Sequence, residues 1–215
     1  MHPILRASLV LAALLAVSSH PAVASPLDSL ERYVDGLEAF GFTGQVLVAR
    51  GDSVLLERAM GDADGKGRAV GPGTRFAAGS ITKSVTASLI VRLAAEGRFS
   101  LDTPLARLLP RVPADKSSIT PRQLLSHTSG LPEDAEGVFE KDTRADVLRA
   151  TLATPLASVP GTRFGYSNAG FQLLAAIAER ATGVAYARLA DSLLFAPASQ
   201  PNARSLSPRF ECSCT

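Results

Sequence analysis

The chain of 215 residues carries 22 Lys and Arg against 20 Asp and Glu, and 46% of its residues are hydrophobic. This near-neutral balance argues against nucleic acid or an anionic membrane surface as a partner, and the length suits one domain with a core of its own. The two cysteines, Cys212 and Cys214, are too close together to link distant elements, and the three histidines are scattered, so we expect no metal site and no cofactor.

Residues 1–24 have the composition of a secretory signal peptide. Arg6 supplies a positive charge, residues 7–17 form an apolar run, and Ala22-Val23-Ala24 is a typical cleavage motif. The apolar run is too short for a stable membrane anchor. We therefore expect a periplasmic or secreted protein whose domain begins at Ser25.

A helix and a β-hairpin are predicted at the start of this domain. Apolar residues at helical spacing predict a helix over 27–40. Two strands, 45–50 and 53–60, are expected to meet at the turn Gly51-Asp52. Glycines and charges over 61–73 indicate a loop.

A second helix is expected to begin near Ser80 and to end at Gly97. Apolar residues at helical spacing predict that one face of it packs in the core: Ile81, Val85, Leu89 and Leu93.

Several further helices follow. Their predicted starts are marked by Thr103-Pro104, Thr120-Pro121 and the Thr143–Asp146 capping box. Ser167-Asn168 precedes a long apolar-striped helix that runs to about Ala181 and is closed by Gly183, and a last helix covers 185–195.

Ser80 and Lys83 form an S-x-x-K pattern at the predicted start of the second helix, and residues three apart lie on one helix face. A serine there lies where free N–H groups and the helix dipole favour developing negative charge. A lysine can act on such a hydroxyl when burial or neighbours lower the lysine pKa. The alternative is a helix N-cap serine followed by a solvated lysine.

Tyr166-Ser167-Asn168 is the second candidate triplet. A loop tyrosine near a lysine and a serine can relay protons, and an asparagine beside it can donate to and accept from an amide substrate. The alternative is a core tyrosine followed by an asparagine that caps the next helix.

Three segments, Ser80 to Lys83, Leu124 to Pro132 and Tyr166 to Asn168, resemble in order and rough spacing the penicillin-recognising serine hydrolases. The similarity is greatest to the class C β-lactamase, D-alanyl-D-alanine carboxypeptidase and esterase branch, and it covers about residues 27–197. It implies an α/β (α+β) fold of the β-lactamase/transpeptidase type: a helical region plus the N-terminal hairpin of a central antiparallel sheet.

The resemblance also implies roles. Ser80 would be the nucleophile, forming an acyl-enzyme with a β-lactam, a D-Ala-D-Ala peptide or an ester, and its N–H would be one oxyanion donor. Lys83 and Tyr166 would share the proton transfers, and either can be the base. Asn168 would orient Lys83 and bind the substrate amide.

Other hydrolase arrangements have less support in the sequence. No serine lies in a G-x-S-x-G motif, which removes the main argument for an α/β-hydrolase. His127 follows Ser126, but adjacency in sequence does not give a Ser–His pair the placement it needs. We therefore interpret Leu124 to Pro132 as scaffold.

The third motif of the family, K-T-G or H-x-G, is absent from this sequence. Residues 198–215 lack periodicity, so we expect an irregular tail outside a domain of 25–197, and hypothesise a truncated or frame-shifted gene product without the later strands. One lost oxyanion donor slows hydrolases by on the order of 100- to 1,000-fold. The alternative function is therefore a catalytically defective fragment that at most binds β-lactams or peptidoglycan peptides.

Overall fold

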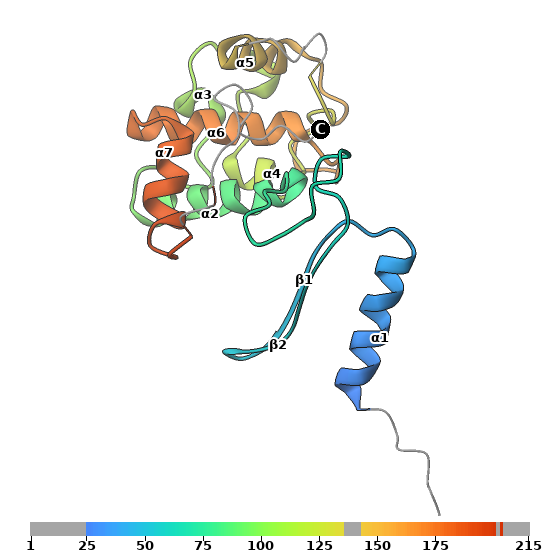
Figure 1. Ribbon diagram of the computed structural model, residues 1–215. Coiled ribbons are helices and arrows are strands. Elements are labelled where there is room, and N and C mark those ends of the chain that lie inside the picture. The colour runs from blue at the N-terminus through green and yellow to red at the C-terminus, as the bar shows by residue number, and fades with distance from the viewer. Residues whose placement is uncertain (1–24, 136–142, 201–202, 204–215) are drawn as a thin grey trace, which may run out of the picture. The chain divides into compact units, whose positions relative to one another are not determined.

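The computed structural model describes residues 25–135, 143–200 and 203, and the chain divides into two compact units, residues 1–76 and 77–215 (Figure 1). The predicted signal peptide, most of the predicted tail and both cysteines lie outside the described residues. Among the residues that are described, no helix combines the length and the apolar character needed to cross a bilayer.

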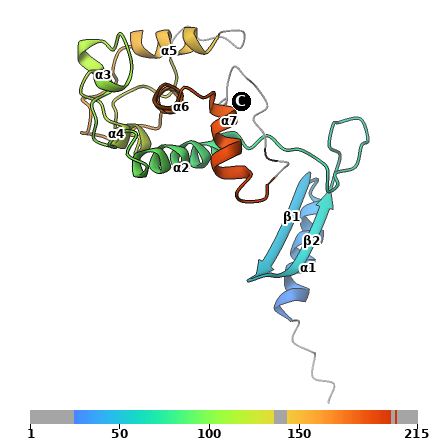
Figure 2. The ribbon, with the colours of Figure 1, turned by 90° about the vertical axis from the view of Figure 1, so that its left-hand side faces the viewer.

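The first unit consists of the predicted helix and hairpin. Helix α1 (Pro26–Ala39) is capped by Ser25, whose hydroxyl accepts the N–H of Asp28 while the Asp28 carboxylate accepts the N–H of Ser25. Strands β1 (Gly44–Arg50) and β2 (Ser53–Met60) pair antiparallel. Both expectations are confirmed, and α1 lies along the hairpin with Val34 packed against Leu56 and Met60 (Figure 2).

In the described residues of the second unit, every regular element is a helix. Its α-helices are α2 (Thr82–Ala95), α3 (Leu105–Leu108), α4 (Pro121–Leu125), α5 (Arg144–Ala153), α6 (Asn168–Thr182) and α7 (Tyr186–Ala190). Two 3₁₀ turns, η1 (Gly79–Ile81) and η2 (Ala114–Lys116), and a π-helical turn, η3 (Asp191–Phe195), complete it. The predicted last helix is therefore divided into α7 and η3.

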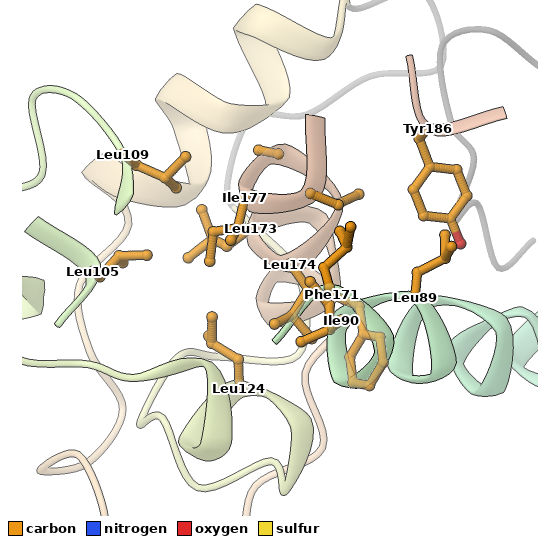
Figure 3. Packing of buried hydrophobic residues seen from close by; sticks show 14 of the residues in the cluster. Leu89, Ile90, Leu105, Leu109, Leu124, Phe171, Leu173, Leu174, Ile177 and Tyr186 are labelled. Carbon is orange, nitrogen blue, oxygen red and sulfur yellow. The ribbon is translucent and has the colours of Figure 1, made fainter. Parts of the chain in front are cut away.

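Helix α6 is the centre of this unit. It contacts each of the other α-helices of the unit, and from Ala169 to Ala178 every residue except Gln172 is buried. Figure 3 shows the result: leucines and isoleucines of several helices surround α6. Burying one such side chain contributes about 1.5–3 kcal/mol. The contact between α6 and α2 is thus well fixed.

Most of the predicted helix starts and ends are confirmed. Thr120 caps α4 and Thr143 caps α5, each in a reciprocal capping box. Gly183 closes α6 in the left-handed conformation at φ +71°. At Thr103-Pro104 the cap of α3 is Pro104 rather than the threonine.

The predicted core face of α2 is wrong at Ile81. This side chain is 73% exposed, whereas Leu89 and Leu93 are fully buried. Ile81 belongs to η1, and a 3₁₀ turn rotates successive residues by a different angle from an α-helix. The apolar stripe therefore does not continue back to residue 81, and Lys83 takes the buried position instead.

Candidate active site

Ser80 lies in the 3₁₀ turn that leads directly into α2, and its side chain is exposed. Gly79 precedes it at φ +51°, a conformation that glycine adopts without steric penalty. The residue that caps α2 is Ile81, with no side-chain capping bond. The alternative of Ser80 as a helix cap is therefore not found, and its hydroxyl is directed to other partners.

Lys83 is buried, with only 8% of its surface exposed. Its ammonium donates to Asn168 Oδ1 at 2.6 Å and reaches Ser80 Oγ at 3.5 Å. It also lies 4.7 Å from the centre of the Tyr166 ring, within cation–π range. A solvated lysine is thereby excluded.

Tyr166 lies at the surface, 36% exposed, in the segment just before α6. Its hydroxyl shares a hydrogen bond of 2.6 Å with Ser80 Oγ. The alternative of a core tyrosine is wrong. Together, the hydroxyl of Ser80 contacts both the phenol of Tyr166 and the ammonium of Lys83, although 86 residues separate Ser80 from Tyr166.

Asn168 is not the cap of α6. Ser167 takes that place, because its hydroxyl accepts the N–H of Gly170 at 3.0 Å. The amide of Asn168 instead bridges two groups, accepting from Lys83 and donating through Nδ2 to Asp134 Oδ1 at 3.0 Å. An ammonium only donates and a carboxylate only accepts, so this orientation of the amide is fixed.

Asp134 was missed by the sequence analysis. It lies two residues beyond Pro132, and no local pattern indicates that its carboxylate reaches the first turn of α6. The same segment meets α6 through its backbone, because the Glu133 carbonyl accepts the N–H groups of Asn168 and Ala169.

His127 contacts the Tyr166 segment. Its ring stacks on the Tyr166 ring with centres 4.7 Å apart, and its Nδ1 accepts the N–H of Ser167 at 3.0 Å. Burial, aided by the charge of Lys83, holds the pKa of His127 below its ordinary value of 6.5. The neighbouring Ser126 hydroxyl instead bonds to Thr128 Oγ1.

In the part of the chain that the structure describes, no group of three His, Cys, Asp or Glu side chains could hold a metal ion. The groups that meet at the site are a hydroxyl, an ammonium, a phenol and an amide, which are suited to acyl transfer.

Comparison with known proteins identifies the family. Residues 31–211 match the sequence model of the family described as Beta-lactamase. The chain belongs to the beta-lactamase family. The predicted resemblance and the predicted fold of the β-lactamase/transpeptidase type are thus confirmed.

One curated relative of this beta-lactamase family chain is an esterase. It is 37% identical to esterase EstB of Burkholderia gladioli over 172 residues, which cover 70% of this chain and 44% of the esterase. The chain thus spans less than half the length of that curated relative.

Two crystal structures give the same result for the fold. SurE superposes with a TM-score of 0.73 at 33% identity, over 86% of this chain and 41% of SurE. The penicillin-binding protein from Bacillus halodurans superposes with a TM-score of 0.70 at 27% identity, over 80% of this chain and 56% of its own. The proteins that this chain resembles thus include an esterase and a penicillin-binding protein.

Proposed function

We propose that this chain is a serine acyl-transfer protein in which Ser80 is the nucleophile. The observation that carries the proposal is the contact of Ser80 Oγ with Tyr166 at 2.6 Å and with Lys83 at 3.5 Å. A nucleophilic serine needs a base within hydrogen-bond reach, and such contacts are often long until a substrate binds.

In the proposed acylation, Ser80 Oγ forms a bond to the acyl carbon of the substrate and its proton passes to Lys83 or Tyr166 in the basic form. The tetrahedral intermediate then expels an amine or alcohol, which takes that proton. The Ser80 N–H, at the positive end of the α2 dipole, is one donor for the oxyanion. Asn168 orients Lys83 and binds the substrate amide.

The proposed substrates are β-lactams, D-amino-acid peptides and esters. The names of relatives support this range, since they include an esterase and a penicillin-binding protein. Ser80 is exposed, so a substrate can approach its hydroxyl from solvent.

A second candidate is a protein that binds or is acylated by such compounds without turnover. It is the alternative left open by the sequence, in which no K-T-G or H-x-G motif is found among the 215 residues.

Labelling of the purified chain with a fluorescent penicillin tests the proposal. We expect covalent labelling that disappears in Ser80→Ala and persists in Ser84→Ala, a matched change at an exposed serine one turn further along α2. Release of the label over time indicates turnover, and its retention indicates the second candidate. Labelling that survives in Ser80→Ala, or no labelling of the parent chain, would contradict the proposal.

We also propose that the chain is exported to the periplasm or secreted, on the composition of residues 1–24. N-terminal sequencing of the exported protein should begin at Ser25. Retention of the whole chain in the cytoplasm would contradict this.

A further inference from the structure

His127 holds the chain on both sides of Tyr166. Its carbonyl oxygen accepts the N–H of Gly165 at 2.8 Å, and its Nδ1 accepts the N–H of Ser167 at 3.0 Å. Between these two bonds, its ring stacks on the Tyr166 ring at an interplanar angle of 30°. Three consecutive residues are therefore fixed by one residue that lies about forty positions earlier in the chain.

The loop that carries His127 is itself attached to the same segment. The carbonyl of Thr128 accepts the N–H of Gly161 at 2.7 Å, and that of Gly130 accepts the N–H of Ala157 at 2.8 Å. His127 adopts φ +56°. The centre of its ring lies 5.1 Å from that of Phe171, a residue of α6 that is buried in the core.

The hydrogen bond to Ser167 defines the chemical form of the ring. Because Nδ1 accepts an N–H, it carries no proton, so the imidazole is neutral with its proton on Nε2. The nearby ammonium of Lys83 and the burial of the ring both favour this neutral form. A neutral ring can stack on Tyr166 without repelling Lys83.

On the basis of the function proposed above, we propose that His127 is a positioning residue for acylation: it keeps the Tyr166 hydroxyl at hydrogen-bond distance from Ser80. Tyr166 belongs to a surface segment between Pro160 and α6 and is 36% exposed. A reacting group displaced by about 1 Å can slow a reaction by on the order of 100-fold. His127 acts through Tyr166 and itself performs no step.

Two variants distinguish the stacking of the His127 ring on Tyr166 from the hydrogen bond that Nδ1 accepts from Ser167. His127→Asn keeps a side-chain acceptor and suits a positive φ, but it removes the stacked ring. His127→Phe keeps a ring and removes the acceptor. Ser126→Ala is the control in the same loop, since the exposed Ser126 hydroxyl bonds to Thr128 and to the Arg122 carbonyl instead.

The experiment measures the acylation rate constant at saturating fluorescent penicillin and, separately, the concentration that gives half of that rate. We expect each His127 variant to lower the rate constant by about 10-fold or more, with the half-saturating concentration changed by less than about 3-fold, because Tyr166 acts in the reaction rather than in binding. Ser126→Ala should keep the parent rate. Melting curves give the folded fraction of each variant, to which the rates are normalised.

Both His127 variants reacting at the parent rate would overturn the inference while leaving the proposed function in place. So would a loss of rate that vanishes after normalisation, since that result describes folding alone. If the parent chain is not labelled at all, the proposed function and this inference fail together. In the parent, the imidazole nitrogen NMR shifts should identify an unprotonated Nδ1 at neutral pH, and a protonated Nδ1 would also overturn the inference.

Discussion

Gly130 is the residue at which a single methyl group should most disturb the loop under Tyr166. It adopts φ +78°, and a Cβ there would overlap the carbonyl oxygen of Ser158 and lie 3.1 Å from the carbonyl carbon. The left-handed conformation costs a non-glycine residue about 1–2 kcal/mol. Overpacking against a backbone atom costs about 1–3 kcal/mol more. Gly130→Ala should therefore lower the free energy of unfolding by about 2–5 kcal/mol.

Thermal and urea unfolding of the parent and variant chains measure this loss, which should lower the melting temperature by at least about 4 °C. Gly165→Ala is the control, because that glycine has no positive φ and a Cβ there would meet no atom within 4 Å. If Gly130→Ala unfolds at the same temperature as Gly165→Ala, the close approach to Ser158 is not a feature of the folded protein, and the reasoning is refuted.

Three further outcomes are expected. Lys83→Met keeps an apolar stem of similar length without the ammonium, so labelling should slow by at least about 100-fold while the chain still unfolds cooperatively. Asp134→Ala removes the acceptor of the Asn168 amide, so labelling should slow by about 10-fold with little change in melting temperature, since Asp134 is exposed. Acidification from pH 7 to pH 5 should lower the melting temperature of the parent more than that of His127→Asn.

The sign of the pH effect follows from the lowered pKa of His127. Below pH 6.5 the unfolded chain binds a proton at His127 that the folded chain takes up only at lower pH. The neutral His127 therefore contributes to the free energy of unfolding above pH 6.5. This contribution is lost as the pH falls through the folded-state pKa of His127. Asp102 and Asp146 also have lowered pKa values, and their contributions are lost only below about pH 4, outside this window.

Each of these expectations has a contradicting result. Parent-like labelling of Lys83→Met would exclude the ammonium from acylation. Unchanged labelling of Asp134→Ala would mean that the Asn168 amide needs no carboxylate to hold it. An identical acid response of the parent and His127→Asn would show that the ring is protonated as readily in the folded chain as in the unfolded one.

Local signals in the sequence were sufficient for most of the fold. Capping residues such as Thr120 and Thr143 satisfy N–H groups within three residues of themselves, so their effect can be read without tertiary structure. The hairpin and its Gly51 turn are equally local. Ile81 was misplaced because a 3₁₀ turn, which the apolar spacing does not reveal, interrupts the helical period.

The candidate site was predictable only in part, because local signals do not describe contacts between distant segments. The motifs pointed to Ser80, Lys83, Tyr166 and Asn168, but sequence spacing does not give the distance between the segments 80–83 and 166–168. Asp134 and the contacts of His127 depend on how the loop after α4 meets the start of α6. Both contacts join residues more than thirty positions apart, and no periodic pattern encodes them.

Peptide mapping by mass spectrometry tests the central claim most directly. After incubation of the purified chain with benzylpenicillin, one acyl adduct should be found, on the peptide that contains Ser80, and fragmentation should place it on Ser80 rather than on Ser84. No adduct, or an adduct on any other residue, would contradict the account of an acylating centre formed by Ser80, Lys83 and Tyr166.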